Sequence, residues 1–148
     1  METSVATVFF SYCHVDEALR DRLEVALHAM KRQKLITTWH DRRIIAGEDF
    51  DRDVRVELER ADVILLLVSP DFIASDYCYD VEMLRALERH AAREARVIPV
   101  ILRACDWRSL PFGKLLAAPR DGKPIRSWPD IDEAFLDVAK KIRAALPR

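Results

Sequence analysis

The sequence contains little glycine, and this scarcity excludes two large classes of nucleotide-binding protein. Only Gly47, Gly113 and Gly122 occur among its 148 residues. The GxGxxG loop of dinucleotide-binding folds and the GxxxxGK[ST] loop of P-loop proteins both need glycines a few residues apart, because the backbone must approach phosphates closely. No two glycines here are close enough, so the chain is neither a conventional dehydrogenase nor a P-loop nucleotide hydrolase.

Cysteine is equally scarce. Cys13, Cys78 and Cys105 are odd in number and form no CxxC spacing. A disulfide framework and a zinc site both need several cysteines at suitable spacings. His14 and His40 have no third ligand at metal spacing. We therefore expect no metal site, no cofactor and no disulfide framework.

The sequence also lacks an excess of positive or negative charge and any long apolar segment. The 24 Lys and Arg residues are balanced by 25 Asp and Glu residues, whereas a general nucleic-acid binder needs a basic surplus. The longest apolar runs are about six residues, far short of the ~20 that a membrane helix needs. The first four residues, METS, lack the basic start and apolar core of a signal peptide. We expect a cytoplasmic protein without nucleic-acid or membrane partners.

Short apolar runs alternate with amphipathic stretches, which is typical of an α/β protein. The runs predict strands at residues 5–10, 35–39, 63–68 and 97–102, with a small edge strand at 124–126. Pro99 cannot donate a ladder hydrogen bond, so its strand is expected at an edge or a bulge. We predict a flavodoxin-like, doubly wound, five-stranded parallel sheet with helices on both faces. A single domain should span residues 1–148, with its core over about 5–146.

Ligands of such sheets bind beyond the carboxyl ends of the strands. This rule selects residues 10–14, 39–47, 69–82 and 103–107. A response-regulator receiver shares the topology, but it needs a phospho-accepting aspartate after the third strand. Ser69 and Pro70 stand there instead, so we set that class aside.

Three of the selected segments carry a family likeness. They read FFSYCHVDE at 9–17, WHDRR at 39–43 followed by Gly47, and SDYCYDVE at 75–82. Together they resemble the opening box, the BB loop and the aromatic-Cys-acidic motif of the Toll/interleukin-1 receptor (TIR) domain family, especially its bacterial branch. The sequence departs from the family pattern at three points. Ala46 replaces the usual proline before Gly47, Leu136 replaces a tryptophan, and Glu82 lies four rather than three positions after Cys78.

The resemblance implies one of two functions: hydrolysis of NAD+ to nicotinamide and ADP-ribose (or a cyclic variant), or adaptor binding to other TIR domains. Cleavage of the nicotinamide–ribose bond releases neutral nicotinamide, so no general acid is needed. Ordinary glycosidases need two carboxylates because their leaving group must be protonated. One carboxylate near the ribose suffices here, and Glu82 is our candidate for it. The competing interpretation is a solvated helix glutamate.

The remaining candidates are substrate-binding residues. A nicotinamide or adenine ring needs an aromatic platform, and the pyrophosphate needs arginine side chains or helix N-termini. Asp41 is expected either on the ribose hydroxyls or in an ion pair with an arginine. Phe10 is equally interpretable as a core residue, the arginines as surface residues, and Cys78 as a buried residue or a rival nucleophile. The full predicted set is Phe10, Ser11, Tyr12, Trp39, Asp41, Arg42, Arg43, Tyr77 and Cys78.

We therefore hypothesise a TIR domain with NAD+ glycohydrolase activity in bacterial anti-phage defence or signalling. By analogy with the family, the activity requires homotypic self-association through the BB loop, residues 41–47, and the domain belongs to a longer protein with a sensor domain. A non-enzymatic adaptor is the alternative. A third possibility is another N-ribosyl-transferring enzyme, such as a nucleoside deoxyribosyltransferase.

Overall fold

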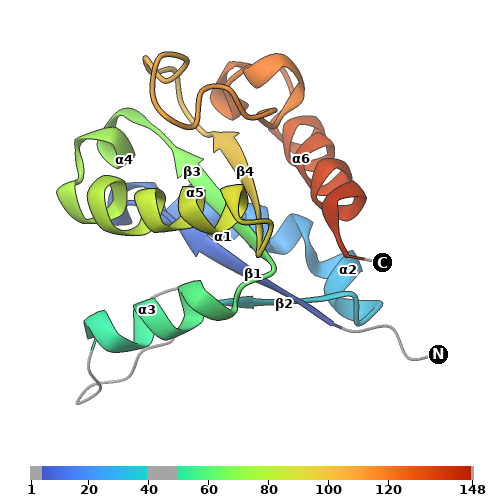
Figure 1. The fold of residues 1–148 in the computed structure, drawn as a ribbon. Coiled ribbons are helices and arrows are strands. Elements are labelled where there is room, and N and C mark those ends of the chain that lie inside the picture. Colours follow the sequence, from blue (N-terminus) through green and yellow to red (C-terminus); the bar gives the residue numbers. More distant parts are fainter. Residues whose placement is uncertain (1–4, 40–49, 148) are drawn as a thin grey trace.

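The structure is a computed structural model that describes residues 5–39 and 50–147. Within these residues four strands form one sheet (Figure 1). They are β1 (Ala6–Ser11), β2 (Ile36–Trp39), β3 (Val63–Val68) and β4 (Arg96–Ile101). Each coincides, to within a residue or two at its ends, with an apolar run of the sequence. The prediction of these four strands is confirmed.

Helices connect and cover the strands. In chain order they are η1 (His14–Asp16), α1 (Glu17–Ala26), α2 (His28–Arg32), α3 (Phe50–Arg60), α4 (Pro70–Ala74), η3 (Tyr77–Met83), α5 (Leu84–Ala91), η4 (Arg120–Gly122), η5 (Ile125–Ser127) and α6 (Ile131–Ala145). The Asp130 carboxylate accepts a hydrogen bond from the Asp132 backbone N–H at 2.9 Å, so Asp130 caps α6. No helix of the described residues combines the length and apolar character needed to cross a bilayer.

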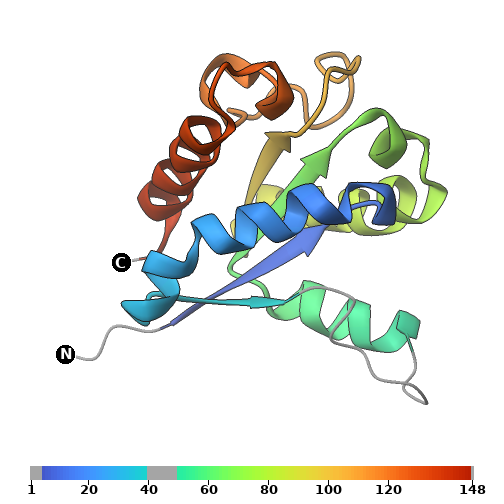
Figure 2. The same cartoon turned by 180° about the vertical axis from the view of Figure 1, so that it is seen from behind.

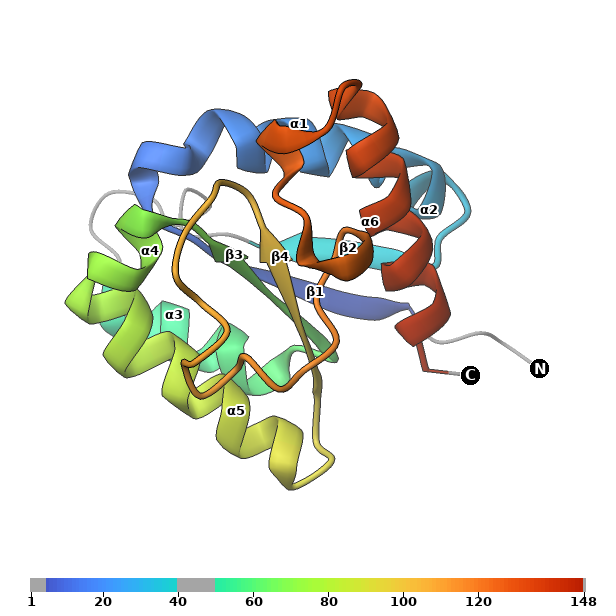
Figure 3. The same cartoon turned by 90° about the horizontal axis from the view of Figure 1, so that it is seen from above.

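The sheet is entirely parallel, with the order β2-β1-β3-β4. Its doubly wound arrangement confirms the predicted flavodoxin-like fold. Figure 3 shows α1 and α6 on one face of the sheet and α3 and α5 on the other, and Figure 2 shows α1 and α6 from behind. The all-apolar strand β3 is completely buried, because helices cover it from both sides.

Strand β1 divides its side chains between two hydrophobic cores. Val8, Phe10 and Tyr12 belong to the core under α1 and α6. Phe9 belongs to the core under α3 and α5. Side chains alternate along a strand, so Ser11 lies on the same face as Phe9. This division decides which residues can share a site.

The predicted fifth strand at 124–126 is wrong. Within the described residues, Ile125–Ser127 is a short 3-10 helix, η5, and β4 meets only an isolated bridge between Val100 and Ala118 on its outer side. The edge of β4 explains this. Pro99 has no N–H, and the Val97 N–H donates to Nδ1 of His90 at 3.0 Å. Few backbone N–H groups on the outer edge of β4 are therefore left to pair with another strand.

Candidate active site

The candidate catalytic residue, Glu82, lies against the carboxyl end of β1. It belongs to η3 and is only 6% exposed. The hydroxyl of Ser11, the last residue of β1, donates a hydrogen bond to Oε1 of Glu82 at 2.5 Å. Ser11 and Glu82 are 71 positions apart in the sequence. The structure thus places Glu82 in a buried, hydrogen-bonded position, and the alternative of a solvated helix glutamate does not describe it.

The segment that carries Glu82 is a π-helix. The sequence predicts an ordinary helix from about residue 75, whereas Tyr77–Met83 forms a π-helix that continues into α5. A π-helix closes its hydrogen bonds between residues i and i+5, so its turn holds an extra residue. Cys78 and Glu82 are buried while Asp80 and Val81 between them are exposed. Asp80 and Glu82 therefore point in different directions.

Cys78 fastens the start of the same segment to the strand. Its thiol donates to the backbone carbonyl of Tyr12 at 3.3 Å, and its backbone N–H donates to the Ser75 hydroxyl at 3.2 Å. The side chain is 7% exposed and belongs to the core under α3 and α5. These contacts agree with the interpretation of Cys78 as a buried packing residue.

Trp39 lies on the same face of the sheet as Ser11. It pairs in register with Phe9, and the two rings stack with centroids 5.3 Å apart and planes 14° apart. Trp39 is half-buried and packs against the core under α3 and α5. Phe9 and Ser11 are alternate residues of one strand. Trp39 and Glu82 therefore both contact β1 from this face, two residues apart along the strand.

Phe10 and Tyr12 face the other way. They are 2% and 4% exposed and belong to the core under α1 and α6. The guanidinium carbon of Arg20 lies 5.1 Å from the ring centroid of Phe10 and 5.7 Å from that of Tyr12. Arg20 is itself 1% exposed. The structure thus places Phe10 where the core interpretation had it, and Tyr12 belongs to the same core.

Several predicted site residues fall outside the described part of the chain. These are Asp41, Arg42 and Arg43, and the rest of the BB-loop segment up to Gly47. The backbone of Tyr77 is described as the first residue of η3, but its side chain is not. The expected contacts of these residues with ribose, pyrophosphate and an aromatic ring therefore stay predictions.

An ionic cluster around a buried aspartate lies at the same edge of the sheet, and sequence reasoning missed it. The Asp16 carboxylate, 2% exposed, accepts from Nε of Arg103 at 2.8 Å and from the hydroxyl of Ser69. Arg103 also contacts Asp71. The hydrogen bond to Asp71 raises the pKa of Arg103, burial opposes this, and the bond to Asp16 adds to the increase. One signal in the sequence links the members of this cluster: a position after the end of a strand, which is shared by Asp16, Ser69 and Arg103.

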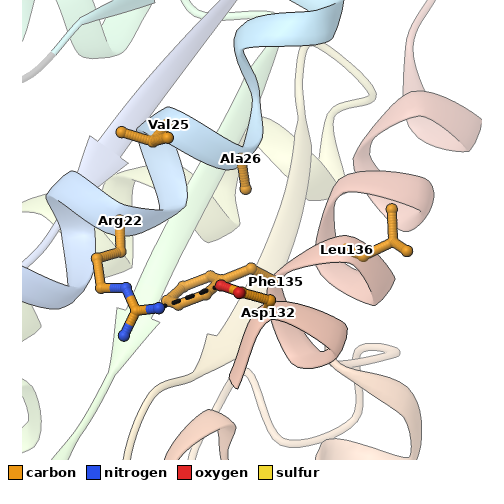
Figure 4. Close-up of a pocket in the computed structure, with 6 residues that line it drawn as sticks. All are labelled: Arg22, Val25, Ala26, Asp132, Phe135 and Leu136. Carbon is orange, nitrogen blue, oxygen red and sulfur yellow. Dashed lines mark hydrogen bonds and ion pairs between the residues drawn. The ribbon is translucent and has the colours of Figure 1, made fainter. Parts of the chain in front are cut away.

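A separate groove of about 420 Å³ lies between α1 and α6, on the face of the sheet opposite Glu82 (Figure 4). Arg22 and Asp132 form an ion pair of 3.1 Å across it. Its apolar lining includes Val25, Phe135 and Leu136. Among the residues that the structure describes, no group of three or more His, Cys, Asp or Glu side chains is placed to hold a metal ion.

Sequence comparison identifies relatives of the chain. The family model for the TIR domain matches residues 8–137. An uncharacterized protein, y4lF, of Sinorhizobium fredii (strain NBRC 101917 / NGR234) is 66% identical over 142 residues. The match covers 96% of this chain but only 44% of that relative. The chain therefore spans less than half the length of the curated relative it matches.

Solved structures with the same fold have low sequence identity to this chain. The TIR domain of the Toll-related receptor TRR-2 from Hydra magnipapillata is 19% identical, with a TM-score of 0.66 over 93% of this chain and 96% of that one. A prokaryotic SEFIR domain is 17% identical, with a TM-score of 0.52 over 93% and 92%. The TIR domains of the activated Roq1 resistosome, which directly recognizes the pathogen effector XopQ, are 19% identical, with a TM-score of 0.51 over 91% and 84%.

These structures share the fold with this chain. The family model covers most of its length, including residues 8–11 of β1, Trp39 and the segment that carries Glu82. The chain therefore belongs to the TIR domain family.

Proposed function

We propose that this TIR domain is an NAD+ glycohydrolase that cleaves the bond between nicotinamide and ribose. The observation that carries the proposal is the position of Glu82. Its carboxylate is buried at the carboxyl end of β1, is oriented by the Ser11 hydroxyl, and lies on the sheet face that also carries Trp39. This is the edge at which parallel α/β sheets bind ligands.

The chemistry needs one carboxylate and one aromatic surface. As nicotinamide leaves, the ribose develops positive charge, and a carboxylate in a site of low dielectric stabilises that charge more strongly than water does. Glu82 supplies the carboxylate. Trp39 supplies a ring against which nicotinamide or adenine stacks, a contact worth roughly 1–3 kcal/mol per ring. Arg42 and Arg43 are assigned to the pyrophosphate, and Asp41 to the ribose hydroxyls.

Self-association and a role in defence are part of the proposal. Residues 41–47 are assigned to homotypic contacts that complete the site of a neighbouring TIR domain. The relative y4lF is more than twice as long as this chain, which fits a longer protein with an additional sensor domain. Within such a protein, depletion of NAD+, or formation of a signal from it, serves bacterial anti-phage defence or signalling.

The test measures nicotinamide release from NAD+ by chromatography at high protein concentration. We expect release by the wild type and a decrease of about 100-fold or more in Glu82→Gln, because one electrostatic group at a developing charge contributes about that factor. Asp80→Asn is the matched control, because Asp80 is an exposed carboxylate on the same π-helix. The proposal fails if Glu82→Gln and the wild type release nicotinamide at the same rate. Nucleosides tested in the same assay identify a nucleoside-transferring enzyme.

The alternative function is a non-enzymatic interaction module. The groove between α1 and α6 favours it, because Val25 on its rim is 68% exposed and Leu136 is 53% exposed. Apolar side chains gathered at an exposed groove mark a contact surface. Absence of nicotinamide release from an assembled sample, together with loss of assembly in Val25→Asp, would establish this function instead.

A further inference from the structure

We propose that Ser11 is a positioning residue: it holds the carboxylate of Glu82 in one orientation, and the Cys78–Tyr12 hydrogen bond anchors the other end of the same π-turn. This inference rests on the proposed function. It differs from the expectation that Ser11 binds substrate, and it concerns how the fold prepares Glu82 for its reaction.

The hydrogen-bonding capacity of Ser11 supports this assignment. A serine hydroxyl has one proton to donate, and Ser11 donates it to Oε1 of Glu82 at 2.5 Å. Ser11 is fully buried, at 0% exposure. Its donor is therefore committed to the carboxylate. A hydroxyl bound to Oε1 of Glu82 restricts rotation of the carboxylate and so favours one orientation of the side chain.

Two contacts join η3 to the end of β1. The Cys78 thiol bonds to the Tyr12 carbonyl and the Ser11 hydroxyl bonds to Glu82. The strand residues are adjacent in sequence, and the helix residues are four apart. Residues four apart lie on nearly the same side of a helical turn, so Cys78 and Glu82 both face the end of β1. The exposed pair between them, Asp80 and Val81, faces away from the strand.

These two contacts hold the carboxylate of Glu82 in one place relative to β1. A glutamate that directs its carboxylate at a substrate must be held in the productive orientation, because a small displacement of a reacting group costs a large factor in rate. The strand end of β1 is a rigid support, since it is hydrogen-bonded to β3 as far as Ser11 and Leu66. Fastening both ends of the turn to this strand end keeps Glu82 in place.

The experiment compares Ser11→Ala with Thr38→Val. Thr38 is a matched control, because it is also a buried strand hydroxyl that donates at 2.5 Å to a carboxylate, that of Glu24. Both variants lose the same type of bond. We expect Ser11→Ala to lower kcat for NAD+ by about 10- to 100-fold, the value of a hydrogen bond to a charged group. KM should change less than twofold, Thr38→Val should keep the wild-type kcat, and Ser11→Thr, which retains the hydroxyl, should recover most of the rate.

A second readout does not depend on activity. Carboxyl carbon NMR, with the Glu82 signal assigned by its loss in Glu82→Gln, follows the titration of this side chain. Loss of the Ser11 donor removes a bond to the charged form, so the titration midpoint should be higher in Ser11→Ala than in the wild type. Thermal melts show whether each variant is folded.

The outcomes separate the two proposals. If the wild type cleaves NAD+ and Ser11→Ala keeps its kcat, the role of Ser11 is refuted while the proposed function stands. If neither the wild type nor Glu82→Gln releases nicotinamide, the proposed function is refuted, and the NMR titration still decides whether Ser11 holds Glu82. An unchanged midpoint in Ser11→Ala refutes the positioning role in either case.

Discussion

Arg89 should be one of the most important single side chains for the stability of this domain. It is 6% exposed, on α5 directly after the π-turn. Its Nη1 donates to the carbonyls of Leu58 and Ala61 at 2.7 and 2.8 Å, and its Nη2 donates to the carbonyl of Glu94 at 3.2 Å. Leu58 lies in the last turn of α3, where helix carbonyls have no partner within the helix. Arg89 therefore satisfies carbonyls at the end of one helix from another.

Replacement of Arg89 by methionine keeps most of the side-chain volume but removes these donors. A hydrogen bond to a charged group contributes about 1.5–3 kcal/mol, and a buried carbonyl left without a partner costs about 1–3 kcal/mol. Because the three bonds share one side chain and water reaches part of the site, we expect a loss of about 3–5 kcal/mol. That is a large part of the 5–15 kcal/mol typical of a domain and lowers Tm by roughly 10 °C.

The assay is urea unfolding followed by circular dichroism, which gives the free energy of unfolding and the m-value. Arg85→Met is the control, because Arg85 lies one turn earlier on the same helix and its ion pair with Glu59 is on the surface. Surface ion pairs contribute little. If Arg89→Met destabilises the domain no more than Arg85→Met, the carbonyl-capping argument is wrong.

Two further predictions concern an acidic residue and a glycine. Burial acts to raise the pKa of Glu24, but hydrogen bonds from Thr38 and Arg20 outweigh it and lower the pKa from 4.5 to about 2. The ionised carboxylate therefore stabilises the fold above pH 4.5, and this contribution disappears as the pH falls toward 2. Urea unfolding should show Glu24→Gln less stable than the wild type at pH 7, with the difference shrinking below pH 4.5, and a constant difference would contradict the assignment. Gly122 has a φ of +67°, and a Cβ there would lie 2.5 Å from Cζ2 of Trp107. Gly122→Ala should therefore lower the free energy of unfolding by about 1–3 kcal/mol. An unchanged Tm in a thermal melt would show that the loop adapts.

The strands were predictable because their signal is local. The runs that form β1 and β3 are apolar and rich in β-branched residues, and such runs are long enough to be buried in a parallel sheet from both sides. The fifth strand was not predictable in the same way. Residues 124–126 depend on whether β4 offers a free edge, and Pro99 and the contact of His90 with Val97 limit that edge.

The site was predictable only in part. The family pattern selected Glu82, Ser11 and Trp39 from the sequence, but it selected Phe10 equally. Alternation shows that Phe10 and Ser11 face opposite sides of the sheet. The sequence of the strand alone does not indicate on which side the candidate site lies, because helices cover both sides and apolar residues occupy positions of both kinds.

The order of the four sheet strands along the chain, their parallel pairing and the family follow from the sequence, because each depends on local patterns of apolar and motif residues. Three contacts could be seen only in the folded chain: Ser11 meets Glu82 across 71 positions, Cys78 contacts the residue after Ser11, and Asp16 binds Arg103. These contacts depend on how separate elements pack, since a hydrogen bond between distant residues forms only when the fold brings donor and acceptor to within about 3 Å.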